Sequence, residues 1–239
     1  MNYTSELISK EMIAEGTMAF YFRKPEGFTW KAGQSIDLTL VNPPETDAEG
    51  NTRAFSIAAA PHEPHLMIAT RMRDTAFKRV LKNAEIGLPV EIAGPFGSFT
   101  LHQKESRPAI MLVGGIGITP FYSMIKDAAE RKLPHKIYLF YSNRRPEDTA
   151  FFEQLSDIEK INSNFVFIPT MTNMEKSSVS WDGEKGFITR DMIEKYVSNR
   201  TDALYYSAGP QPMVAAMRKI LSEMGVSDDD IRTEEFTGY

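Results

Sequence analysis

The sequence contains no cysteine, and this absence excludes several chemistries at once. The chain alone cannot form disulfides, thiolate nucleophiles, cysteine-held iron–sulfur clusters or a c-type haem attachment. It also has no apolar run near the roughly 20 residues that span a bilayer. Residues 1–6 show neither the basic nor the apolar part of a secretory leader. We therefore expect a cytoplasmic protein without a membrane span.

Positive charge and histidine are also scarce. The net charge is −5 and neither half of the chain is basic, so a nucleic-acid-binding role is not expected. Two of the four histidines, His62 and His65, lie close together in a proline-rich turn. They could form part of a metal site, but histidines of a solvated loop are the simpler interpretation, and we expect no bound metal.

The first half of the chain, residues 1–104, consists mainly of short segments in which apolar and polar residues alternate. A period of two is typical of antiparallel strands with one buried face. We expect this half to close into a small β-barrel, because closure removes exposed strand edges. The expected strands include residues 18–22, 35–40, 66–73 and 90–99, the last ending in a Gly-Pro turn.

A single helix and one long loop interrupt the predicted barrel. Residues 76–82 have helical character, and Asp74 or Thr75 can cap them. Residues 42–51 are rich in Pro, Asp and Glu and should form an exposed loop.

The pattern changes near Arg107-Pro108, after which apolar strands alternate with helices. This order is typical of a parallel sheet with helices on both faces. The sequence thus predicts a second, α/β domain over residues 105–239. Its expected strands are 110–113, 137–142, 164–170, 203–208 and 231–236, and its expected helices are 121–132, 151–160, 189–197 and 213–224.

The turn after the first of these strands reads Gly114-Gly115-Ile116-Gly117-Ile118-Thr119-Pro120. Glycines allow the backbone to approach another group closely, and Pro120 suits the first turn of a helix. A strand, a glycine turn and a helix start present N–H groups and a positive helix end to a phosphate. The turn does not match G-x-G-x-x-G, so an ordinary strand-to-helix turn is the alternative.

A second candidate site lies in the barrel half, at Arg53-Ala54-Phe55-Ser56. An Arg for a phosphate, an aromatic ring for stacking and a hydroxyl for a ring nitrogen would suit a flavin. The alternative is a surface Arg beside a core Phe. The helix start at Thr75, next to Arg71, is a further candidate anion site, unless it is only an ordinary helix cap.

Polar residues also follow the second strand of the α/β half. Ligands of open α/β sheets bind beyond the carboxyl ends of the strands. Ser142, Arg144 and Arg145 lie at such an end, and an Arg there could bind a ribose phosphate. This weakly favours NADPH over NADH, and a solvated loop is the alternative. The turn at residues 208–213 lies at another such end.

Four stretches in this order resemble the ferredoxin–NADP reductase superfamily of flavoenzymes, and the resemblance covers nearly the whole chain. They are Arg53-Ala54-Phe55-Ser56, Gly94-Pro95-Phe96-Gly97, Gly114–Pro120 and Ala208-Gly209-Pro210-Gln211-Pro212-Met213. The resemblance implies an FAD-binding β-barrel, residues 1–104, followed by an NAD(P)-binding domain, residues 105–239. Where the family often has Cys-Gly, this chain has Ala208-Gly209.

The resemblance also implies roles for particular residues. For the flavin, it implies Arg53, followed by Ala54, at the phosphate, Phe55 on the ring and Ser56 at N5. It also implies Ala69, Thr70 and Arg71 beside the diphosphate. Thr75, Ala76 and Phe77 fall at the position where the family usually has a serine. Thr75 would replace that serine, because Phe77 occupies its position. For the nicotinamide dinucleotide, it implies Gly115, Gly117, Thr119, Gly209 and Met213. Phe236 would cover the flavin ring, with Tyr239 as a competing candidate, and Ser56 and Glu234 would act in catalysis, Glu234 as a proton relay.

The implied activity is hydride transfer from NADPH or NADH to bound FAD, followed by electron transfer to a separate acceptor. A ferredoxin or flavodoxin is the leading candidate acceptor. A reductase component of an oxygenase, a flavin or ferric reductase, and a non-catalytic flavin- or nucleotide-sensing subunit are the alternatives. A basic patch of Lys78, Arg79 and Lys82 could attract an acidic partner, unless it is only a solvated helix face.

Overall fold

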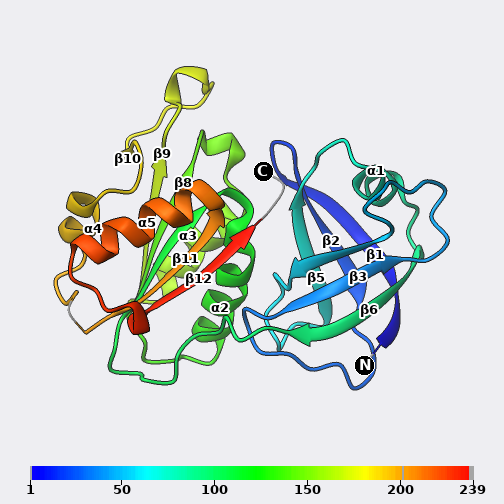
Figure 1. The fold of residues 1–239 in the computed structure, drawn as a ribbon, viewed down its shortest axis with the longest axis horizontal. Helices are drawn as coiled ribbons and strands as arrows, with labels where there is room; N and C mark the ends of the chain where they lie inside the picture. The colour runs from blue at the N-terminus through cyan, green and yellow to red at the C-terminus, as the bar shows by residue number, and fades with distance from the viewer. Residues whose placement is uncertain (1, 201, 237–239) are drawn as a thin grey trace.

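The computed structural model describes residues 2–200 and 202–236, and it contains two six-stranded sheets side by side (Figure 1). The first sheet contains β1 (Asn2–Ala14), β2 (Thr17–Arg23), β3 (Ser35–Leu40), β4 (Thr52–Ser56), β5 (His65–Arg71) and β6 (Pro89–Phe96), with α1 (Ala76–Asn83) before β6. Its order is β4-β3-β6-β1-β2-β5, and every neighbouring pair is antiparallel.

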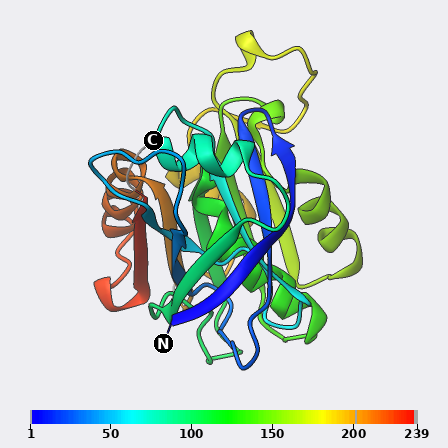
Figure 2. The same cartoon turned by 90° about the vertical axis from the view of Figure 1, so that its right-hand side faces the viewer.

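This sheet curls into the expected barrel. The long strand β1 crosses the barrel (Figure 2) and pairs with β2 at one end and with β6 at the other. Just beyond β4, the Ala58 N–H donates to the Met67 carbonyl of β5 at 2.8 Å, which brings the two edge strands together. Alternate residues of β3 are buried, in agreement with the period of two in the sequence.

One sequence expectation for the barrel is wrong. Gly94-Pro95 does not end the strand but lies inside β6, with a cis peptide bond. Ser35 pairs with Phe96 and Asp37 pairs with Ala93, so two residues of β6 oppose one residue of β3. The Gly-Pro pair therefore forms a bulge, a position that tolerates residues unsuited to a regular ladder.

The second sheet is parallel throughout and has the order β10-β9-β8-β7-β11-β12. It contains β7 (Ala109–Gly114), β8 (Ile137–Asn143), β9 (Phe165–Met171), β10 (Glu184–Lys185), β11 (Leu204–Pro210) and β12 (Ile231–Phe236). The chain builds outward from β7 through β8 to one side, then returns to the other side of β7 with β11. The strand order therefore reverses between β7 and β11, where open α/β sheets bind ligands.

Helices cover both faces of this sheet, as expected. They are η1 (Gly115–Gly117), α2 (Ile118–Glu130), η2 (Pro146–Asp148), α3 (Phe152–Ile161), η3 (Met174–Lys176), α4 (Arg190–Tyr196), α5 (Gln211–Glu223) and η4 (Asp228–Asp230). In β7, Met111 and Val113 join the core beneath α2 and α3, whereas Ile110 and Leu112 join the core beneath α4 and α5. Two-sided burial explains why β7 reads as a continuous apolar run.

The element ends differ from expectation at two turns. α2 begins at Ile118 rather than Phe121, and α5 begins at Gln211, so Pro120 and Pro212 both lie in first helical turns, where a missing N–H costs nothing. The expected loop after β9 contains η3 and β10 and projects from the body in both views (Figures 1 and 2). Within the described residues, no helix is long and apolar enough to cross a membrane.

The two sheets share one packed boundary. The main hydrophobic core runs without a break from the barrel into α2. Ser123 of α2 donates a hydrogen bond to the Ala59 carbonyl at 2.6 Å, and Lys126 pairs with Glu63. Residues 97–108 connect the sheets without a helix or strand, and the domain boundary predicted at 104/105 lies within them.

Candidate functional site

The Arg53–Ser56 segment forms β4, an edge strand that pairs only with β3. Arg53 and Phe55 are half-buried on one face, Ala54 is exposed, and Ser56 is buried on the other face opposite Ser35. Arg53 and Phe55, the residues suggested for the flavin phosphate and ring, thus share one face of β4, and the Ser56 hydroxyl lies on the other. The Phe55 ring has an aromatic neighbour outside its own strand, because it lies 5.8 Å from the ring of Phe77 in α1.

The start of α1 lies beside Arg53, so two anion sites that the sequence suggested separately form one. Thr75 caps the helix by accepting a hydrogen bond from the Lys78 N–H, as predicted. The Arg53 guanidinium lies 5.3 Å over the Phe77 ring. The Asp47 carboxylate bridges the two parts, accepting from Arg53 at 3.0 Å and from the Ala76 N–H at 3.2 Å. We call this guanidinium and this N–H the α1 cradle.

The end of β5 connects the barrel to the α/β domain. Ala69 and Thr70 are buried, and β5 contacts η1, the glycine turn after β7. The Arg71 guanidinium lies 3.9 Å from the Asp148 carboxylate of η2, while the Arg71 carbonyl accepts a hydrogen bond from Lys78 at 2.7 Å. Arg71 therefore reaches across the domain boundary rather than into the α1 cradle.

The glycine turn after β7 leads into a helix start that no side chain caps. Gly115 has φ of 52°, a left-handed conformation that favours glycine. Thr119 turns its hydroxyl to the Ile116 carbonyl at 3.2 Å, and no side chain caps the start of α2. The first N–H groups of α2 lack a side-chain acceptor, so this helix end can receive an anion.

The same glycines are also required by packing against β11. A Cβ on Gly117 would lie 2.6 Å from the Ala208 carbonyl oxygen, and a Cβ on Gly209 would lie 3.0 Å from the Gly114 carbonyl oxygen. The Met213 sulfur lies against Gly114 on the same side. Close approach of β7 and β11 at the switch point therefore explains these glycines without any ligand.

The residues after β8 have separate roles. The Arg145 guanidinium makes a two-pronged ion pair with Asp148, at 2.8 and 3.0 Å, and reaches Glu15 of the barrel at 3.0 Å. Arg144 is exposed and makes no ion pair with any described residue. Ser142 is half-buried beside it. The structure leaves Arg144, not Arg145, available for a ribose phosphate.

The end of β12 brings a carboxyl group to the switch point. Glu234 lies opposite Ala208 of β11, and its Oε2 atom has no hydrogen-bond partner among the described residues. Burial raises the pKa of Glu234 to about 7. Phe236 ends β12 opposite Pro210, half-buried against the main core, whereas Tyr239, its predicted competitor, lies outside the described residues.

Sequence reasoning missed two residues of this site. Asp47 lies in the loop expected to be merely exposed, and Lys78 was assigned to a basic patch. Burial first, then the charges of Arg73 and Arg53, lowers the pKa of Lys78 to about 8. Arg79 of that predicted patch is paired with Glu45 and Asp74, whereas Lys82 is exposed and makes no ion pair with a described residue, so the patch stays a prediction.

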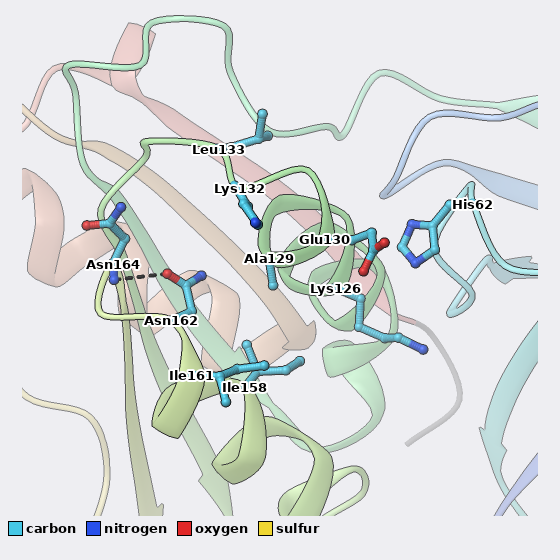
Figure 3. Close-up of a pocket in the computed structure, with 10 residues that line it drawn as sticks. All are labelled: His62, Lys126, Ala129, Glu130, Lys132, Leu133, Ile158, Ile161, Asn162 and Asn164. Carbon is cyan, nitrogen blue, oxygen red and sulfur yellow. Dashed lines mark hydrogen bonds between the residues drawn. The ribbon is translucent and has the colours of Figure 1, made fainter.

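Two hollows mark the surface of the described residues. The larger, of about 1580 Å³, follows the connection between the sheets and extends from Trp30 to Glu234. The smaller, of about 540 Å³, lies between α2 and α3, with Leu133, Ile158 and Ile161 on its walls (Figure 3). The smaller hollow includes no residue of the candidate site.

Comparisons with known proteins agree with this arrangement. Residues 111–219 match the family described as an oxidoreductase NAD-binding domain. The chain is 26% identical over 223 residues to the glycine betaine monooxygenase reductase subunit of Chromohalobacter salexigens, covering 92% of this chain and 60% of that protein. It is 30% identical over 213 residues to the phenol 2-monooxygenase reductase component DmpP of Pseudomonas sp. strain CF600, covering 87% of this chain and 58% of that protein.

The fold of the chain is shared with a solved enzyme structure. A ferredoxin NADP⁺ reductase from Neisseria gonorrhoeae, with bound FAD and NADP, superposes with a TM-score of 0.82 and 19% identity. The superposition covers 98% of each chain. The chain thus spans the whole of that structure, but only 60% and 58% of the two curated relatives.

Proposed function

We propose that the chain is a member of the ferredoxin–NADP reductase-like superfamily, and that it is an NAD(P)H-dependent, FAD-containing reductase that passes electrons to a separate acceptor. One observation carries the proposal. The α1 cradle of the barrel and the glycine turn of the α/β domain are held in one packed body, with β5 in contact with η1. A flavin and a nicotinamide dinucleotide would thus bind on facing domains.

The residues of the α1 cradle fit a flavin phosphate. Arg53 and the Ala76 N–H already bind one carboxylate, that of Asp47, in the geometry that a phosphate oxygen pair would use. Arg53 and Thr75 would hold the diphosphate, and Phe55 would pack on the flavin ring. When bound, FAD would supply the chemistry, accepting a hydride from NAD(P)H and releasing electrons to an acceptor.

The chain's own residues would orient the reactants and hold a proton. Ser56 is buried, and its hydroxyl would donate a hydrogen bond to a ring atom. Gly209 adds no side chain at the switch point, so a nicotinamide can approach the end of β11. Glu234 would hold the proton, since its pKa of about 7 lets it gain or lose one near neutral pH.

Coenzyme choice would depend on Arg144. An exposed guanidinium without an ion pair can bind a 2′-phosphate, whereas Arg145 would have to give up Asp148 and Glu15 first. We infer a preference for NADPH on this ground. The same contacts assign Arg145 to domain docking.

The acceptor would lie outside these 239 residues, because they contain no cysteine to hold a cluster. A ferredoxin or flavodoxin remains the leading candidate. A terminal oxygenase component is the second, supported by the relatives that are reductase components of monooxygenases.

The test is an anaerobic titration of the flavin-loaded protein with NADPH and, separately, NADH, following the visible band of the oxidised flavin. We expect rapid bleaching, faster with NADPH, and sustained turnover with an artificial acceptor. Arg144→Ala should raise KM for NADPH roughly tenfold, the loss of about one charge-assisted contact, and leave KM for NADH unchanged. A bound flavin that neither coenzyme bleaches would instead support the sensing subunit.

A further inference from the structure

The loop between β3 and β4, residues 42–51, folds back over α1 and delivers an acidic side chain to the α1 cradle. Asp47 uses both carboxylate oxygens there, one for Arg53 and one for the Ala76 N–H. The adjacent Glu49 also pairs with Arg53, at 2.9 Å, but its side chain is 74% exposed. Asp47 therefore stands where the proposed function requires a flavin phosphate.

The Arg53 guanidinium is held in place without help from Asp47. Its Nη1 atom donates to the carbonyls of Glu49, Gly50 and Thr52 at 2.8 to 3.0 Å. Its plane also rests over the Phe77 ring. Removing the Asp47 carboxylate would thus leave a positioned guanidinium with an open donor, together with a helix N–H that needs an acceptor.

Lys78 adds positive charge beside the α1 cradle, which the exposed Glu49 partly offsets. Lys78 is half-buried next to Arg53 and Arg73, which helps to lower its pKa to about 8. Partial burial would raise the pKa of Asp47, but hydrogen bonds from Glu49 N–H, Ala76 N–H and Arg53 outweigh it, and the pKa lies below its usual value. Asp47 is therefore an anion at neutral pH, held by a site built for anions.

We propose that Asp47 is an internal counter-anion that a flavin phosphate must displace, and that this carboxylate sets the affinity of the chain for its flavin. The proposal rests on the proposed function. Two anions cannot share the same guanidinium N–H and the same helix N–H, so the flavin binds only the fraction of molecules in which the Asp47 side chain has released the α1 cradle. The other acidic side chains of the loop, Glu45 and Glu49, make only exposed ion pairs, with Arg79 and Arg53.

The test compares flavin binding by the full chain, stripped of flavin, with binding by Asp47→Ala. FAD is titrated and its fluorescence quenching followed. If molecules in which Asp47 occupies the α1 cradle outnumber those in which it does not by about ten to one, Asp47→Ala binds FAD about tenfold more tightly. Glu45→Gln is the matched control, because it removes one negative charge from the same loop without touching the α1 cradle. Equal gains in the two variants would overturn the proposal, leaving only a general effect of charge.

A second readout separates competition from a structural role. Asp47→Ala should lower the melting temperature of the flavin-free protein but not that of the FAD-loaded protein, since the flavin replaces the lost carboxylate. If Asp47 instead supports the bound flavin, the variant melts earlier in both forms and binds FAD more weakly, which contradicts the proposal. Asp47→Asn, which keeps the shape of the side chain, repeats the test should Asp47→Ala fail to fold.

Inorganic pyrophosphate distinguishes failure of this inference from failure of the proposed function. We expect calorimetry to detect pyrophosphate binding that is tighter for Asp47→Ala than for the unchanged chain. If no variant binds FAD but this order holds, the flavin proposal fails and the counter-anion stands. If FAD binds all variants alike and pyrophosphate shows no preference, the counter-anion fails and the flavin proposal stands.

Discussion

Among single residues, Glu234 has the clearest perturbation. Its carboxyl group is buried at the end of β12, and burial is the sole cause that raises its pKa from the ordinary 4.5 to about 7. No described residue gives its Oε2 atom a hydrogen bond. An unpaired buried carboxyl is held neutral near pH 6 and becomes charged just above neutrality, which suits a group that exchanges a proton during turnover.

Glu234→Gln should change the pH dependence of stability in a defined direction. The folded protein binds this proton more tightly than the unfolded chain does. The free energy of unfolding therefore falls as the pH rises from 4.5 through 7. The variant should match the unchanged protein near pH 4.5 and exceed it above pH 7, by at most about 3 kcal/mol. Urea unfolding at a series of pH values measures this, with the exposed neighbour Glu235→Gln as the control. Parallel curves for the unchanged protein and Glu234→Gln would refute the assignment.

Among elements, the junction of β7, η1 and β11 combines a packing role with a proposed binding role. Gly114 and Gly117 both have φ angles that alanine adopts freely, −123° and −58°. Their difference lies in what an added methyl group would meet. At Gly114 it would meet the movable Met213 side chain, and at Gly117 it would meet the backbone of β11.

Gly117→Ala should therefore destabilise the protein more than Gly114→Ala. At Gly117 the Cβ would lie 2.6 Å from the Ala208 carbonyl oxygen, and one backbone must move, at a cost of about 2–3 kcal/mol. At Gly114 the Met213 thioether can rotate away and the Pro210 ring, 3.1 Å from the added Cβ, must shift slightly, at a cost of about 1 kcal/mol. Urea midpoints rank the two variants. The reverse ranking would mean that β11 can move more easily than the Met213 side chain.

The elements also show what the sequence could and could not predict. The period of two in β3, the two-sided apolar run of β7 and the cap at Thr75 are local patterns, and each predicted its element. The bulge at Gly94-Pro95 was misread, because a bulge depends on the partner strand, which a local pattern does not contain.

The candidate site, too, could be predicted only where its signals are local in the sequence. The sequence indicated Arg53 and the helix start at Thr75, but not that they meet. The contact that joins them links Asp47 to Ala76 across 29 positions, and Arg145 meets Glu15 across 130 positions. Such contacts follow from the packing of the whole chain, so only the structure could separate Arg144 from Arg145.

At the scale of the molecule, the two domains are joined by one core and by polar contacts on several sides. The Ala59 carbonyl accepts hydrogen bonds from Trp30 of the barrel at 3.2 Å and from Ser123 of α2 at 2.6 Å. Arg145 reaches Glu15, and Arg232 donates to the Thr100 carbonyl at 2.9 Å. Because apolar burial is continuous across the boundary, neither domain can unfold without exposing core of the other.

We therefore expect both domains to unfold in one transition, and the two tryptophans can test this. Trp30 is buried in the barrel, and Trp181 lies in the α/β domain beside Phe152. Trp30→Phe leaves a reporter for the α/β domain, and Trp181→Phe leaves one for the barrel. In each variant, tryptophan fluorescence and far-UV circular dichroism should give the same urea midpoint.

The hydrogen bond from Ser123 to the Ala59 carbonyl, at the boundary between the domains, allows a second test of their coupling. Adding Ser123→Ala removes one donor from the Ala59 carbonyl, which should lower stability by about 1 kcal/mol. If the domains are coupled, this loss shifts the midpoint reported by Trp30 and the midpoint reported by Trp181 together, although Ser123 belongs only to the α/β domain. A midpoint that moves for one reporter alone, or two midpoints before the substitution, would mean that the domains unfold independently. The α1 cradle and the glycine turn would then no longer be held in one rigid body, and the proposed hydride transfer would require domain closure on binding.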